Sequence, residues 1–147
     1  MPTTTRVAGL VLLASLAFGA VAAAPTTFYG EDQTPGGVVP ADGNAATARA
    51  SFLSLLVGVD SQGFEGYDTG RGAPLAIAFA GGAGQTINAT LDGDGRIADD
   101  PVVGRFNTTP GGSKWWEVGG AFSIAFDRPI SAFGFYGTDI GDFGGDF

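Results

Sequence analysis

The chain has 147 residues, a formal net charge of -8, and neither histidine nor cysteine. The lack of both residue types excludes disulfides, thiol nucleophiles, zinc–thiolate sites and the usual histidine general base. The acidic excess argues against nucleic acid as a partner, because binding to phosphate backbones depends on clustered lysine and arginine. Hydrophobic residues make up 44% and charged residues 15% of the chain, which argues against disorder.

Residues 1–24 have the organisation of a signal peptide. Arg6 precedes an apolar, charge-free run over residues 7–21, and small residues at 20–24 offer cleavage sites. The alternative, an uncleaved membrane anchor, needs roughly 20 apolar residues, and this run is shorter and ends in alanines. We therefore predict export through the inner membrane to the periplasm, the cell surface or the extracellular space. Residues 25–147 then form a single domain without a membrane anchor.

The N-terminal part of this domain, residues 25–60, is predicted to be a loop followed by one helix. The acidic pair Glu31 and Asp32 lies in the loop and indicates a solvated turn, with a cation contact as the alternative. The helix is predicted over residues 44–57, with Asn44 as N-cap and Gly58 as the left-handed residue that follows it. Its broad apolar face predicts packing against a sheet.

Residues 61–147 are predicted to be strands. Residues 75–79 and 87–91 each alternate apolar side chains with small or polar ones, and the glycines at 81–84 predict a hairpin between them. Residues 122–126 also alternate, Pro129 breaks the run, and residues 130–136 predict the second strand of another hairpin. The expected fold is all-β, an antiparallel β-sandwich of jelly-roll type with one packed α-helix.

A candidate calcium site lies in residues 92–100. Closely spaced carboxylates and a glycine are typical of loops that wrap oxygen ligands around a hard cation. If Gly95 is aligned with the invariant glycine of an EF-hand loop, however, Thr90 takes the first ligand position and Pro101 replaces the final glutamate. The alternative is a plain hairpin turn, for which Asp-Gly is a common choice. The candidate ligands are Asp92, Asp94, Asp99 and Asp100.

Two adjacent tryptophans follow. Side chains alternate along a strand, so Trp115 and Trp116 should face opposite ways. We predict that Trp116 faces the core and that Trp115 shares the outer face with Glu117. An exposed aromatic flanked by polar groups can stack on a sugar ring, so Trp115 is the candidate carbohydrate-binding residue. The alternative is an aromatic packed under a neighbouring loop.

Three aspartates, Asp139, Asp142 and Asp146, lie in the glycine-rich C-terminal run. They are candidates for a second cation site. The alternative is that they are edge and turn residues whose charge discourages sheet-to-sheet aggregation.

The run FGFYGTDIGDFGG at residues 133–145 resembles a segment of exported bacterial proteins of the PEP-CTERM (exosortase-sorted) class. The pieces FYGED at 28–32, the helix at 44–58, and GRF at 104–106 with Trp116-Glu117 extend the resemblance over most of the chain. The resemblance implies a signal peptide, a β-rich extracellular domain, and a C-terminal sorting module. That module is missing, and the chain stops at Phe147 where another strand is expected, so the sandwich is predicted to be C-terminally truncated.

The sequence therefore predicts an exported, noncatalytic extracellular or cell-surface domain, associated with exopolysaccharide or biofilm matrix and holding structural calcium. The rival is a carboxylate-dependent enzyme that acts on polysaccharide. Such an enzyme needs two carboxyl groups about 5 to 10 Å apart across the sugar, for which Glu65 and Glu117 are the candidates. A third possibility is a nonfunctional fragment of a longer surface protein.

Overall fold

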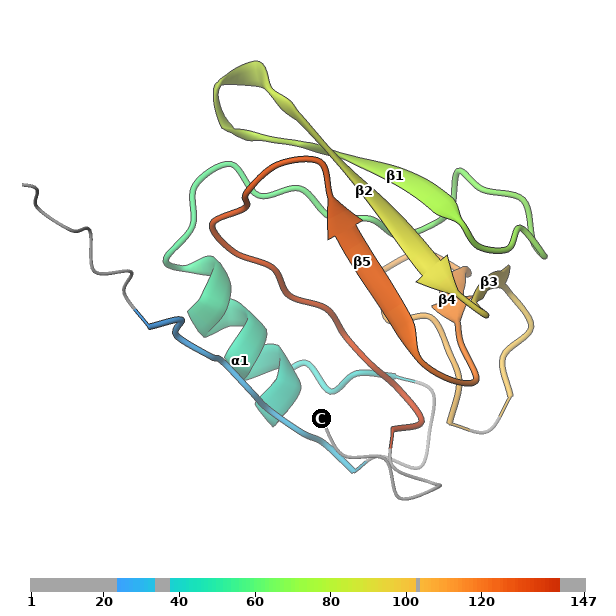
Figure 1. The fold of residues 1–147 in the computed structure, drawn as a ribbon. Helices are drawn as coiled ribbons and strands as arrows, with labels where there is room; N and C mark the ends of the chain where they lie inside the picture. Colours follow the sequence, from blue (N-terminus) through green and yellow to red (C-terminus); the bar gives the residue numbers. More distant parts are fainter. Residues whose placement is uncertain (1–23, 34–37, 103, 141–147) are drawn as a thin grey trace, which may run out of the picture.

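The computed structural model of the chain describes residues 24–33, 38–102 and 104–140 (Figure 1). Almost all of the predicted signal peptide, together with Asp142 and Asp146, lies outside the described residues. The described part contains one α-helix and five strands in two antiparallel sheets, with strand orders β1-β2-β5 and β3-β4. This agrees with the predicted all-β class carrying one helix. The elements are α1 (Asn44–Leu53), β1 (Leu75–Ala80), η1 (Gly82–Gly84, a 3₁₀ turn), β2 (Thr86–Gly93), β3 (Arg96–Ala98), β4 (Trp115–Glu117) and β5 (Phe122–Phe126).

The predicted hairpin between β1 and β2 is confirmed. The strands pair antiparallel from Leu75 opposite Leu91 to Ala80 opposite Thr86.

Two side chains occupy backbone groups on the outer edge of β1, the edge that pairs with no strand in the described residues. The carboxylate of Asp60 accepts the Ala80 amide at 2.7 Å, and the Tyr67 hydroxyl donates to the Ala76 carbonyl at 2.9 Å. The bond from Ala80, together with one from Ser61, lowers the pKa of Asp60.

The predicted hairpin between residues 122–126 and 130–136 is wrong. β5 pairs with the middle strand β2, with Ile124 opposite Leu91, and residues 130–136 form no strand. The ladder continues past β5, because the Asp127 amide donates to the Asn88 carbonyl at 2.9 Å. Residues 130–136 are held by ring packing instead of a ladder. Phe133 meets Phe126 edge to face, with ring centroids 5.5 Å apart.

The core lies on one face of the three-stranded sheet. Side chains alternate along β1 and β2: from Leu75 to Ala80 and from Thr86 to Leu91, every second residue is buried or half-buried and the residues between are exposed. The small sheet contributes Ile97, which is fully buried (0% exposed) and belongs to the same cluster as the buried residues of β1 and β2. The buried residues are Leu75, Ile77, Ala89, Leu91 and Ile97, and half-buried Phe64, Tyr67, Phe79, Trp116, Ile124 and Phe126 pack against them.

The helix is shorter than predicted and ends at Leu53, not at residue 57. The amides of Leu55 and Leu56 bond to carbonyls only three residues back, which tightens the chain into a turn. Val57 is consequently 99% exposed, and no residue of α1 is buried, so the predicted packing of a broad apolar face against the sheet is not found. None of the helices in the described residues is long and apolar enough to span a membrane.

The start of α1 is capped from a distant part of the chain. The predicted N-cap residue, Asn44, does not cap the helix; Gly43 occupies that position and has no capping side chain. The carboxylate of Asp32 accepts the amides of Asn44 and Ala45 at 2.7 and 2.9 Å. The acidic pair predicted to be a solvated turn therefore contains a structural residue, since a carboxylate at a helix N-terminus satisfies free amides and complements the helix dipole.

Candidate functional site

The candidate calcium loop forms a corner between the two sheets. β2 ends at Gly93 in the three-stranded sheet, and β3 begins at Arg96 in the two-stranded sheet, so the turn joins no hairpin. Gly93 has a φ of 122°, a conformation that favours glycine. Gly95 lies against the indole of Trp116: a Cβ there would come within 2.2 Å of ring carbons. The glycines of this segment are thus required by the corner itself.

The corner and its neighbourhood do not bring the four predicted aspartates together. The Asp92 carboxylate accepts the adjacent Gly93 amide at 2.8 Å, and Asp99 accepts the Thr69 hydroxyl at 2.6 Å. Asp94 lines a hollow beside β4, and Asp100 is exposed. Within residues 24–33, 38–102 and 104–140, no group of three acidic side chains could hold a metal ion. The calcium site stays a prediction, and the geometry adds nothing to it.

Trp116 of β4 faces the core, as the alternation predicts, whereas Trp115, predicted to be exposed, is half-buried. Trp116 packs against the core, and its indole nitrogen is buried without a hydrogen-bond partner in the described part of the chain. Trp115 lies on the other side of β4 together with Glu117, and both residues are half-buried. Arg96 lies directly opposite Glu117 on β3. We call the surface formed by Trp115, Glu117 and Arg96 the β4 outer face.

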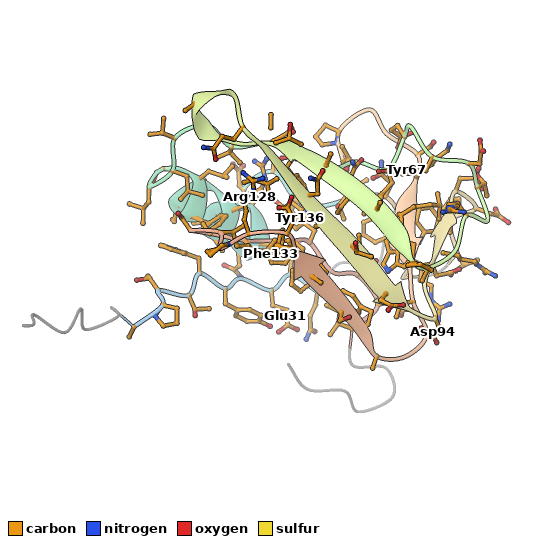
Figure 2. The ribbon with its side chains drawn as sticks, turned by 45° about the horizontal axis from the view of Figure 1, so that its top comes forward. Glu31, Tyr67, Asp94, Arg128, Phe133 and Tyr136 are labelled. Atoms are coloured by element: carbon orange, nitrogen blue, oxygen red, sulfur yellow. The ribbon has the colours of Figure 1, made fainter. Side chains whose placement is uncertain are left out.

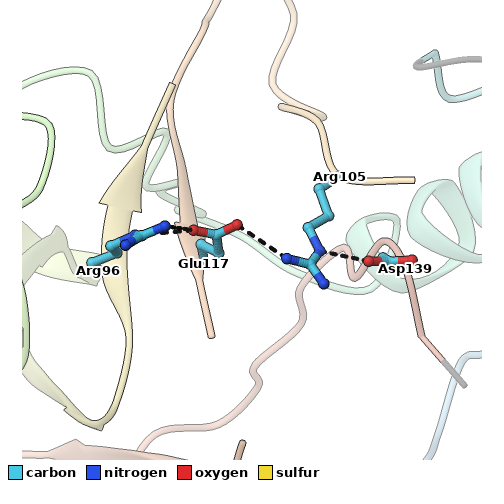
Figure 3. A network of polar contacts seen from close by, with 4 residues as sticks. All are labelled: Arg96, Arg105, Glu117 and Asp139. Carbon is cyan, nitrogen blue, oxygen red and sulfur yellow. Dashed lines mark hydrogen bonds and ion pairs between the residues drawn. The ribbon is translucent and has the colours of Figure 1, made fainter. Parts of the chain in front are cut away.

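An alternating chain of charges crosses the β4 outer face (Figure 3). Arg96 donates to Oε2 of Glu117 through Nη2 at 2.7 Å and Nε at 3.0 Å. Arg105 donates through Nη1 to Oε1 of the same carboxylate at 3.4 Å and through Nε to Asp139 at 2.6 Å. The bond to Asp139 raises the pKa of Arg105 above its ordinary value. This series of ion pairs links β3 and β4 to the segment that follows β5.

A hollow of about 250 Å³ lies beside these charges. Its lining of charged side chains suits a small polar group better than an apolar ligand. Sequence reasoning missed Arg96 and gave Arg105 no role, because their pairing depends on the β3–β4 register and on the distant Asp139. The lining residues are Asp94, Arg96, Arg105, Glu117, Val118 and Gly119.

Glu65, the other glutamate proposed for catalysis, has a structural environment. Its carboxylate accepts the amides of Ser113 and Lys114, each at 2.8 Å, and the Ser113 hydroxyl at 3.2 Å. The two backbone bonds lower the pKa of Glu65 below its ordinary value. A general acid for glycoside cleavage requires a raised pKa, so Glu65 does not suit that role. The contacts instead fasten the loop before β4 to the turn at residues 64–67.

The Glu65 contacts predict a specific acid sensitivity. Because the pKa of Glu65 is lowered on folding, its stabilising contribution is complete above its unfolded-state pKa. That contribution is lost as the pH falls through the folded-state pKa. In Glu65→Gln, thermal melts should show a midpoint below wild type at neutral pH and a difference that shrinks as the pH falls below the unfolded-state pKa of Glu65. If the difference in melting midpoint between the variant and wild type stays constant with pH, the ionised carboxylate of Glu65 is not what holds the loop before β4.

Comparison with protein-family models, curated proteins and solved structures gave no match for this chain.

Proposed function

We propose that the protein is an exported, noncatalytic domain of the cell surface or extracellular matrix that binds polysaccharide through the β4 outer face. The observation that carries the proposal is the position of Trp115 beside the Glu117–Arg96 ion pair on one face of the small sheet. An aromatic side chain provides a stacking surface for a sugar ring, and the adjacent charged groups provide donors and acceptors for its hydroxyls.

Export and architecture belong to the same proposal. The sequence of residues 1–24 supports export, and the resemblance to PEP-CTERM proteins supports an extracellular matrix setting. We infer a sandwich of jelly-roll type, for which the support is the contact of Ile97 and Trp116 of the small sheet with the buried face of the large one. A surface role also fits the mixed charges of the β4 outer face, since sugar hydroxyls both donate and accept hydrogen bonds.

The proposal predicts that Trp115→Ala weakens glycan binding. The purified chain is first screened on an array of bacterial polysaccharides, and the affinity for the best ligand is then measured by calorimetry. Loss of one stacking contact should weaken binding about fivefold, because a stacking contact contributes about 1 kcal/mol.

Tyr29→Ala is the matched control, because Tyr29 is an aromatic side chain that is 77% exposed and lies outside the β4 outer face. It should leave the affinity unchanged. If Trp115→Ala binds every ligand as wild type does, or if the array shows no ligand at all, polysaccharide binding through this face is refuted.

A further inference from the structure

The alternating charges on the β4 outer face end in a guanidinium with free donors. Arg96 uses Nε and Nη2 for Glu117, and its Nη1 has no partner among the described residues. Its side chain is 65% exposed, whereas that of Glu117 is 17% exposed. The unpaired donors of Arg96 therefore face solvent at the rim of the hollow.

Arg105 offers a second set of donors on the other side of Glu117. Its Nε and Nη1 are used by Asp139 and Glu117, and its Nη2 has no partner among the described residues. These bonds orient both guanidinium groups. Oriented donors lose less conformational freedom on binding, so the free donors of Arg96 can recognise a planar anionic group.

The alternation of charges favours a negatively charged ligand group next to Arg96. Acidic and basic side chains alternate in the order Asp139, Arg105, Glu117, Arg96, and an anion next to Arg96 would continue this alternation. Guanidinium groups bind carboxylates through two parallel hydrogen bonds, which a neutral hydroxyl cannot match.

We propose that the ligand of the β4 outer face is an acidic sugar, a uronic acid unit of a polysaccharide. Its carboxylate binds to the free donors of Arg96 at the rim of the hollow while its ring stacks on Trp115. Residues two apart on a strand are about 6.6 Å apart, so Trp115 and Glu117 are separated by about the width of one sugar ring. This inference rests on the proposed polysaccharide binding.

The negative net charge of the protein opposes long-range attraction of an acidic polysaccharide. A net charge of -8 repels a polyanion, but at physiological salt the charges act over only about 8 Å. Recognition then depends on the local groups. Of these, Asp94 lines the hollow and opposes an anion there. Removal of its charge should therefore strengthen binding, an effect opposite in sign to the loss of an arginine.

The test measures the affinity of the full chain for trigalacturonate and for neutral galactotriose, by calorimetry at physiological salt. Wild type should prefer trigalacturonate. Arg96→Gln should weaken trigalacturonate binding at least tenfold and galactotriose binding much less, because only the acidic sugar has a carboxylate for the guanidinium, whereas Asp94→Asn should strengthen trigalacturonate binding. Arg128→Gln is the matched control: Arg128 also pairs with an acid, Asp127 at 3.2 Å, and lies at the opposite end of the sheet from Asp94 (Figure 2).

The outcomes separate the two proposals. Arg96→Gln removes an exposed ion pair of small energetic weight, and a thermal melt verifies that the variant folds. Equal binding of both trisaccharides by wild type, or equal losses in Arg96→Gln and Arg128→Gln, overturns the acidic-sugar inference and leaves polysaccharide binding in place. If trigalacturonate, galactotriose and the whole polysaccharide array fail to bind, both proposals are overturned.

Discussion

Ile97→Ala is expected to lower the free energy of unfolding by about 3 kcal/mol. Ile97 is 0% exposed and comes from the small sheet into the cluster formed by β1 and β2. Truncation removes the buried methyl groups and leaves a cavity between the two sheets, and the rigid ladders on either side limit its collapse. Urea denaturation followed by tryptophan fluorescence measures the change, because Trp116 packs against the same cluster.

Val57→Ala is the matched control for Ile97→Ala. It removes a β-branched side chain that is 99% exposed, so the free energy of unfolding should change by less than about 0.5 kcal/mol. Equal losses in the two variants would mean that the small sheet does not pack on the large one.

Gly95→Ala is expected to be similarly damaging although it adds a single methyl group. The new Cβ would lie 2.2 Å from Cε2 and Cζ2 of Trp116, far inside van der Waals contact. Because the indole is itself packed on the core, relief requires a shift of β4 or of the corner, at a cost of about 3 kcal/mol. Urea denaturation measures the loss, and near-ultraviolet circular dichroism should report a changed environment of Trp116.

Gly66→Ala separates this clash from a general effect of replacing glycine. A Cβ at Gly66 meets nothing within 4 Å. Its loss of stability should be small or absent, because alanine also reduces the freedom of the unfolded chain. If Gly95→Ala unfolds at the same urea concentration as wild type, the close approach of Gly95 and the indole is wrong.

Local patterns predicted the parts of the fold that depend on neighbours in the chain. The hairpin β1–β2 follows from alternation on both sides of a glycine-rich turn. The opposite orientations of Trp115 and Trp116 follow from the pleat of a single strand. Both inferences needed only the period of two that any strand has.

Features that depend on distant partners could not be predicted in this way. The alternation of residues 122–126 indicates a strand, but nothing local shows that β2, and not residues 130–136, pairs with it. The cap on α1 comes from Asp32, twelve residues before Asn44, where local rules favoured Asn44 itself.

The candidate site was predicted only in part, for the same reason. Trp115 and Glu117 were placed on one face by alternation alone. Arg96 could be assigned to the site only when the β3–β4 register placed it opposite Glu117. Arg105 could be assigned to it only when the structure placed Asp139 beside it. The aspartates at residues 92–100 illustrate the reverse, because closeness in sequence did not make them a cluster in space.

The side chains that close the outer edge of β1 affect how the protein behaves at high concentration. An exposed strand edge is a template on which other chains can add and form fibrils. At β1 the Ala80 amide and the Ala76 carbonyl are already occupied by Asp60 and Tyr67. An incoming strand would have to break both bonds and approach the charge of Asp60. The protein thus carries its own protection against fibril growth along this edge.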